Sequence, residues 1–112
     1  MNQQAVTNPP ALTELLAGSA GFVVVFTARW SPASQPLFRA TTDELAASGV
    51  PVVAVDVDAY PNYADQFSVV SVPTVLVLVG VDERRRFVGA TSPADVVDAV
   101  DALGLIAKKG QP

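Results

Sequence analysis

The sequence has 112 residues, of which 50% are hydrophobic and 16% charged, a composition typical of one globular domain rather than of a disordered chain. Its net charge of −4 disfavours nucleic acid as a partner, because phosphate binding needs clustered basic side chains. The absence of cysteine and histidine excludes disulfides, thiolate nucleophiles, cysteine-ligated metal centres and the serine–histidine relay of common hydrolases.

The N-terminal part of the chain predicts one helix and one strand. Residues 1–10 show no regular pattern, and we expect them to be flexible. From Pro10 onward, leucines spaced three and four residues apart predict a short helix that ends at Gly18. The β-branched and aromatic run at 22–26 then predicts a strand that is buried on both faces.

A polar turn at 29–35 leads into the next helix. The apolar face of this helix predicts that it runs to about Ser48, with Gly49 just past its end as a C-cap. The apolar run at 52–57 predicts a second buried strand. Strand, helix and strand in this order predict a right-handed crossover between two parallel strands.

The C-terminal half predicts a helix, a hairpin and a final helix. The short helix covers about 61–67, and two strands follow, Thr74–Val79 and Arg84–Val88, joined by a turn that suits a hairpin. The final helix has Ser92 as its N-cap and Pro93 at its first position.

These elements predict one α/β domain over residues 11–105, followed by a polar tail at 106–112. Helices can cover both faces of a central mixed sheet of four or five strands, which gives a three-layer α/β/α sandwich. The N-terminus lacks the basic start and apolar core of a signal peptide, and no apolar run is long enough to span a bilayer. We therefore expect a cytoplasmic monomer without contact to membranes.

Three short motifs stand at the strand ends of this domain. The segment FTARWSPAS at 26–34 follows the first buried strand, Val72-Pro73-Thr74 precedes and opens the third, and FVGA at 87–90 ends the fourth. In this order and spacing the motifs resemble the thioredoxin family over residues 11–105. The resemblance implies the thioredoxin fold and a family of disulfide oxidoreductases that serve cellular redox homeostasis.

The family's redox motif is Trp-Cys-x-x-Cys, which the resemblance places at residues 30–34. It puts the attacking cysteine at Ser31 and the resolving cysteine at Ser34, with Pro32 and Ala33 between them. A serine hydroxyl stays protonated at neutral pH, and oxygen forms no counterpart of the disulfide bond. We therefore expect no disulfide-exchange activity from the chain as written, and neither a cofactor nor a metal.

The resemblance also implies a binding groove beside these serines. It places a cis peptide bond between Val72 and Pro73, facing the turn, and it builds the groove from this loop, Gly89 and Trp30. In the family such a groove holds an extended peptide, whose backbone can bond to free backbone groups as in strand addition. A protein or an extended peptide is accordingly the expected partner.

The sequence departs from the family pattern at three further positions. By this alignment Val25 stands where the family often has a buried acid, and Ala54 stands where it has a lysine that tunes the resolving thiol. The proline that kinks the long helix is displaced, here to Pro36. The missing acid and its missing charge partner agree with the missing redox cysteines.

Each site residue also has an ordinary structural interpretation. Ser31 and Ser34 both suit helix caps, a role that is compatible with their standing at the cysteine positions. Trp30 could pack in the core, but it precedes a polar turn, which favours the groove. Pro73 could be a trans proline at a strand start, although the flanking motifs favour the cis bond.

Two charged clusters favour structural roles. Arg84–Arg86 is best explained as a solvated edge strand that discourages self-pairing, with a patch for an acidic partner as the alternative. Asp56 and Asp58 lie two residues apart at a strand end, but no third metal ligand accompanies them.

Two hypotheses for function stay open. The chain is either a redox-inactive thioredoxin-like module that binds a protein through the groove, or a cysteine-to-serine variant of a thiol–disulfide oxidoreductase whose native form reduces protein disulfides. The codons of the native gene at positions 31 and 34 would separate them, and the apolar residues Val25 and Ala54 favour the first. A serine-dependent enzyme would lack a general base.

Overall fold

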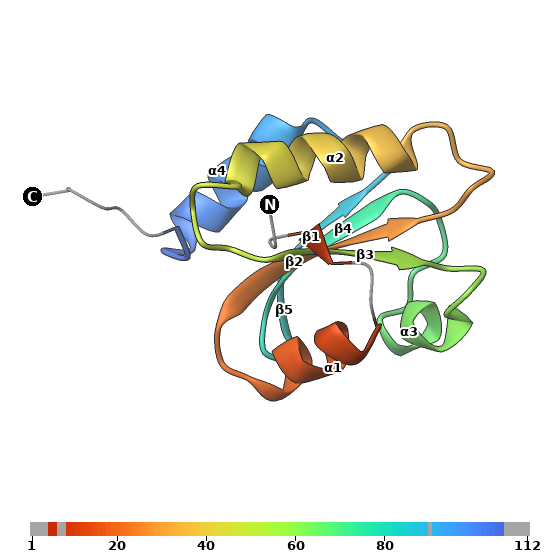
Figure 1. The fold of residues 1–112 in the computed structure, drawn as a ribbon, viewed down its shortest axis with the longest axis horizontal. Coiled ribbons are helices and arrows are strands. Elements are labelled where there is room, and N and C mark those ends of the chain that lie inside the picture. The colour runs from red at the N-terminus through yellow and green to blue at the C-terminus, as the bar shows by residue number, and fades with distance from the viewer. Residues whose placement is uncertain (1–4, 7–8, 90, 107–112) are drawn as a thin grey trace, which may run out of the picture.

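Five strands form one mixed sheet in the order β1-β3-β2-β4-β5 (Figure 1). The computed structural model describes residues 5–6, 9–89 and 91–106. Strand β3 runs parallel to both β1 and β2, β4 runs antiparallel to β2, and β5 antiparallel to β4. The strands are β1 (Ala5–Val6), β2 (Gly21–Thr27), β3 (Val52–Asp56), β4 (Thr74–Val79) and β5 (Asp82–Val88).

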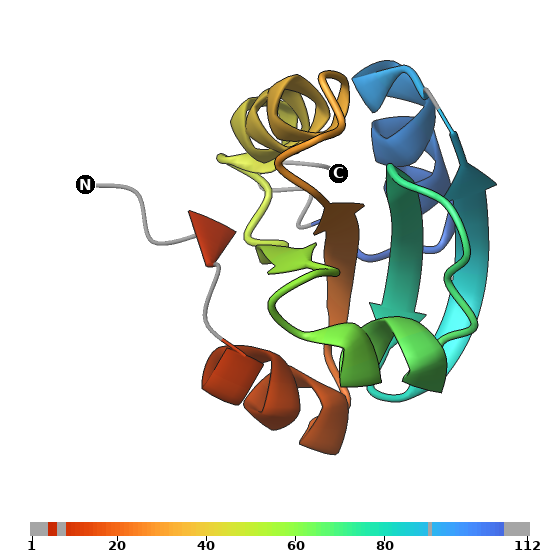
Figure 2. The ribbon, with the colours of Figure 1, turned by 90° about the vertical axis from the view of Figure 1, so that its right-hand side faces the viewer.

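Helices cover both faces of this sheet, as the sequence predicted. Two of them, α2 and α4, lie side by side on one face, and α1 and α3 lie on the other (Figure 2). In the described ranges no helix is long and apolar enough to cross a membrane. The helices are α1 (Pro9–Ala17), α2 (Ser34–Leu45), α3 (Pro61–Gln66) and α4 (Pro93–Ala102).

Strand β2 at the centre contributes side chains to two hydrophobic cores, because successive side chains of a strand point to opposite faces. Val23 and Val25 pack with residues of α2 and α4, among them Leu37. The alternate residues of β2 pack with Leu12 of α1 and with Phe67, just after α3. The predicted burial of this strand on both faces is confirmed, and the set that faces α1 and α3 is Phe22, Val24 and Phe26.

The structure differs from the sequence prediction at several element ends. We expected residues 1–10 to be flexible, but Ala5–Val6 pairs with β3 and α1 already begins at Pro9. Helix α2 ends at Leu45 rather than near Ser48, and Gly49, with φ of +83°, closes the turn that follows it. A strand of two residues is too short to show an alternating pattern, which is why the sequence did not predict it.

The carboxyl ends of β2 and β3 meet at one edge of the sheet because the two strands are parallel. The start of β4 lies at the same edge, since Thr74 pairs with Phe26 near the end of β2. Loops from three strands therefore converge there, and Figure 2 looks onto this edge. In open α/β sheets such a convergence of loops is the usual place for a binding site.

Arg86 on the edge strand β5 is tied to the neighbouring structure. Its guanidinium donates two hydrogen bonds of 2.8 Å to the Glu83 carboxylate and one of 2.6 Å to the carbonyl of Phe67. The sequence interpretation of a solvated edge holds for Arg84 and Arg85, which are exposed, but not for Arg86, which is half-buried.

The ion pair between Glu83 and Arg86 makes a small pH-dependent contribution to stability. The hydrogen bond from Arg86 lowers the pKa of Glu83, so the pair stabilises the fold near neutral pH. The Glu83 carboxylate takes up a proton at a higher pH in the unfolded chain than in the folded chain. The contribution to stability is therefore lost as the pH falls through the lowered pKa of the folded state. Both side chains are partly solvated, so we expect less than about 1 kcal/mol.

Thr41, on the buried face of α2, has an unsatisfied hydroxyl group in the described structure. It is fully buried, and within the described residues its hydroxyl has no hydrogen-bond partner. Replacing it by valine, which has the same shape without the hydroxyl, should raise the free energy of unfolding by about 1 kcal/mol in a urea titration. The matched control is Thr42→Val, which should lower that free energy because the Thr42 hydroxyl donates to the Phe38 carbonyl at 2.8 Å. Equal destabilisation by both variants would show that the Thr41 hydroxyl is satisfied in solution.

Candidate functional site

Ser34 closes the turn between β2 and α2 from the inside. The side chain is fully buried, and its Oγ accepts the backbone N–H of Ala28 at 3.2 Å. The hydroxyl proton has two acceptors at 3.1 Å, the carbonyls of Ala28 and Ser31, of which it can serve one at a time. The Ser31 N–H donates a hydrogen bond to the Ala28 carbonyl at 3.1 Å. Ser34 therefore holds residues 28–34 in one compact turn.

Neither serine caps α2 with its side chain, so that structural interpretation was wrong. The N-cap of α2 is Ala33, which makes no side-chain hydrogen bond, and Ser34 is already the first residue of the helix. Ser31 is buried, with 8% of its surface exposed, and in the described part of the chain its hydroxyl has no partner. The two hydroxyls thus differ, since the Ser34 hydroxyl makes hydrogen bonds within the turn and the Ser31 hydroxyl makes none in the described residues.

Trp30 stands on the surface of this turn and does not pack in the core. Its side chain is 63% exposed, and its indole N–H donates to Oδ2 of Asp58 at 2.8 Å. Asp56 holds the loop that carries this acceptor, because its Oδ1 accepts the backbone N–H groups of Asp58 and Ala59 at 2.8 and 3.2 Å. The loop after β3 therefore fixes the ring over the end of the sheet.

These contacts also account for the paired aspartates. Their carboxylates are occupied by backbone and indole donors, and the described residues contain no group of three or more acidic side chains that could hold a metal ion. The sequence did not predict the Trp30–Asp58 contact. The signal for it was the position of Asp58, two residues beyond the end of a strand parallel to β2.

The loop before β4 contains the cis peptide bond between Val72 and Pro73 that the resemblance implied. Pro73 is buried, and its carbonyl accepts the N–H of Gly89 at 2.9 Å. The Thr74 hydroxyl donates to the carbonyl of Ser71 at 2.8 Å, which closes the loop from the other side. Val72 itself is half-buried, and within the described ranges its backbone N–H and carbonyl make no hydrogen bond. These two groups are therefore free to pair with another chain.

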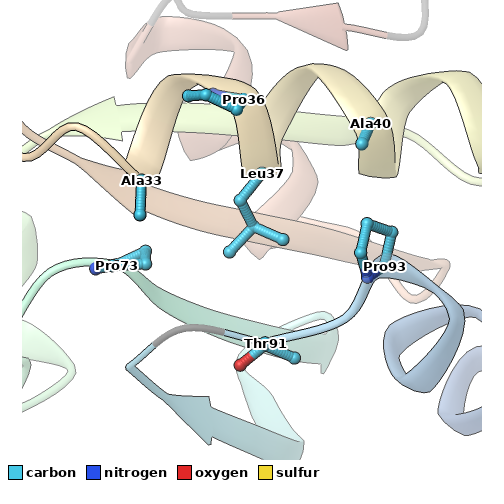
Figure 3. A pocket seen from close by; sticks show the side chains of 7 residues that line it. All are labelled: Ala33, Pro36, Leu37, Ala40, Pro73, Thr91 and Pro93. Atoms are coloured by element: carbon cyan, nitrogen blue, oxygen red, sulfur yellow. The ribbon is translucent and has the colours of Figure 1, made fainter.

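The turn and the proline loop meet at a pocket of about 330 Å³. Figure 3 shows Ala33 and Leu37 of the α2 side opposite Pro73, with Thr91 and Pro93 closing the other side. The structure therefore brings Ala33 of the turn and Pro73 of the proline loop to one pocket, and Gly89 is tied to Pro73 by its hydrogen bond. Pro32 lies exposed on the turn. The sequence did not predict the contribution of α4, because a contact between two helices far apart in sequence leaves no local pattern.

Apolar side chains are exposed around this edge. Trp30 follows β2, Tyr60 follows β3, Val70 precedes β4, and Val88 pairs with the first residue of β4. Val70 is 94% exposed and Val88 is 61% exposed. Four exposed apolar side chains therefore lie in or beside the loops that meet at this edge. A fifth exposed residue, Val81, lies at the turn between β4 and β5, at the other edge.

The positions where the resemblance places the redox cysteines and their charged neighbours hold serine, valine and alanine. Val25 and Ala54 are direct neighbours across β2 and β3 and both are buried, so no charge stands behind the turn. The chain has no cysteine at any position. What the site offers is an exposed indole, a free stretch of backbone at Val72 and an apolar pocket.

Comparison with known proteins agrees with this geometry. The family model described as thioredoxin matches residues 4–102. A thioredoxin from Mycolicibacterium smegmatis is 33% identical over 107 residues, which cover 88% of this chain and 93% of that protein. A bifunctional thioredoxin reductase/thioredoxin from Mycobacterium leprae is 30% identical over 105 residues, covering 88% of this chain but 23% of that longer protein.

Solved structures show the same fold. A mutant thioredoxin from Halobacterium salinarum superimposes with a TM-score of 0.76 at 19% identity, covering 88% of this chain and 87% of that one. A mutant thioredoxin from Entamoeba histolytica gives a TM-score of 0.68 at 26% identity, covering 88% of this chain and 96% of that one.

Proposed function

The chain belongs to the thioredoxin family, and from that premise we propose that it binds an extended segment of a partner protein without thiol–disulfide exchange. The binding site is the groove formed by Trp30, Val72, Pro73 and Gly89. Disulfide exchange needs a thiolate to attack and a second thiol to resolve the mixed disulfide. Serine stands at both positions, so neither half-reaction is available.

The free backbone of Val72 is the observation that carries the proposal. An extended peptide laid along this residue can donate to its carbonyl and accept from its N–H, as a strand does at a sheet edge. Pro73 cannot donate, and its carbonyl already accepts the N–H of Gly89, so of the two residues at the cis bond only Val72 has both backbone groups free. Backbone pairing of this kind needs no sulfur.

In this proposal the exposed indole of Trp30 supplies an apolar contact for the bound peptide. Its ring is held in place by Asp58, so binding costs little ordering of the side chain. Tryptophans of this kind often dominate binding energy at interfaces. The Asp58 contact leaves the ring faces open while it satisfies the polar N–H.

A random nonapeptide library displayed on phage tests this proposal. Peptides selected on the unsubstituted chain should lose at least about tenfold in affinity for Trp30→Ala and for Val72→Asp, measured by fluorescence polarisation of the labelled peptide. The control is Val81→Asp, because Val81 is an exposed valine at the opposite edge, away from the groove. Circular dichroism of each variant establishes that the fold is intact. Unchanged affinity for both groove variants would rule out the groove as the binding site.

A further inference from the structure

The pocket beside Pro73 offers very little polar surface to an occupant. Its lining is apolar apart from the hydroxyl of Thr91, and that hydroxyl donates to the carbonyl of Gly89 at 3.0 Å. No charged side chain lines it. A charged or hydrogen-bonding group placed there would lose its water without compensation, so the uncharged lining selects an apolar occupant.

The pocket is large enough for a large side chain. Its volume of about 330 Å³ lies at the lower end of the range for pockets that hold small molecules. Leu37 lies at the centre of the pocket wall in Figure 3, with Pro73 and Pro93 on either side. The walls come from the first turns of α2, the start of α4 and the loop residues Pro73 and Thr91, and the pocket is open in this structure.

The pocket continues the groove. Pro73 contributes to the pocket wall, and the free backbone of Val72 is the adjoining residue. Side chains of an extended peptide alternate in direction at a rise of about 3.3 Å per residue. In a peptide whose backbone pairs with Val72, a side chain near the paired position therefore points past Pro73 toward the pocket.

We propose that this pocket holds one aliphatic or aromatic side chain of the bound peptide and thereby sets its sequence preference. This inference rests on the proposed function and adds to it the chemistry of one position in the partner. Trp30 and Val72 hold any extended peptide, whereas the pocket discriminates between peptides by a single side chain.

Filling the pocket from α2 tests the inference. Ala40→Leu places a larger side chain in the lining, and Ala102→Leu on the exposed end of α4 is the matched control. Peptides selected on the unsubstituted chain should share an aliphatic or aromatic residue at one fixed position. Changing that residue to alanine should weaken binding at least about tenfold for the unsubstituted chain and for Ala102→Leu, but less than about twofold for Ala40→Leu.

A second measurement needs no variant. The apolar side chain of the selected peptide should give intermolecular NOEs to the methyl groups of Leu37. Trp30 is the chain's single tryptophan, so its fluorescence reports occupation of the groove independently of the pocket.

The outcomes separate the two proposals. Suppose that the peptide changes Trp30 fluorescence while its alanine variant loses affinity equally for the unsubstituted and Ala40→Leu chains, or while no NOEs to Leu37 are seen. Either result overturns the pocket proposal and leaves the groove proposal standing. The absence of any peptide that changes Trp30 fluorescence overturns the proposed function itself. Self-association of the unsubstituted chain in sedimentation, abolished by Ala40→Leu, would assign the pocket to a second copy and overturn the inference.

Discussion

The double variant Ser31→Cys, Ser34→Cys should reduce insulin disulfides with dithiothreitol as electron donor, whereas the unsubstituted chain should not exceed the uncatalysed rate. Residue 31 precedes α2 and residue 34 opens it, and a helix N-terminus lowers the pKa of a nearby thiol. The second thiol then closes an intramolecular disulfide and releases the insulin chain. The expected change is from no turnover to catalytic turnover, read as insulin turbidity over time.

The single variant Ser31→Cys is the control for this gain. It can attack insulin but cannot resolve the mixed disulfide, so it should give a trapped adduct and no turnover. A folded double variant that stays inert would show that the turn does not hold residues 31 and 34 as a redox pair.

Ser34→Ala should lower the free energy of unfolding by about 1–3 kcal/mol, measured by urea denaturation. The substitution leaves the backbone N–H of Ala28 buried without its acceptor and removes the hydroxyl that donates to the turn carbonyls. The effect therefore comes from an unsatisfied buried donor rather than from lost volume.

Ser31→Ala is the matched control for this prediction. Its hydroxyl has no partner in the described residues, so the free energy of unfolding should change by no more than about 0.5 kcal/mol. Equal effects at the two positions would contradict the assignment of Ser34 as the residue that closes the turn. The contrast also bears on the double-cysteine variant, because a thiol at position 34 is a weak hydrogen-bond donor and should hold the turn less well.

The elements with local signals were predictable from the sequence. The apolar run 22–26 and Thr74–Val79 lie within strands β2 and β4, and Ser92 caps α4 with its side chain, which accepts the N–H of Ala94 at 3.3 Å. Each of these signals depends on residues within one turn or one strand. The edge strand β1 and the half-buried Arg86 were missed, because each is defined by a partner distant in sequence.

The site was predictable where a motif fixes the backbone and not where side chains meet. The resemblance carried by the three motifs implied both the cis bond before Pro73 and a turn that faces this loop. The roles of Ser34 and Asp58 depend on hydrogen bonds across the turn and between loops, which leave no periodic pattern. The pocket between α2 and α4 depends on how two helices pack, so only the structure gives it.

The central claim is that the chain binds an extended peptide without the sulfur atoms of the redox cysteines. One comparison of dissociation constants tests it. A peptide selected on the serine-containing chain should bind that chain and the fully reduced Ser31→Cys, Ser34→Cys variant with affinities equal within about twofold, because neither hydroxyl contributes to the paired backbone of Val72. A dissociation constant more than about tenfold lower for the reduced double variant would contradict the account and assign recognition to the thiols.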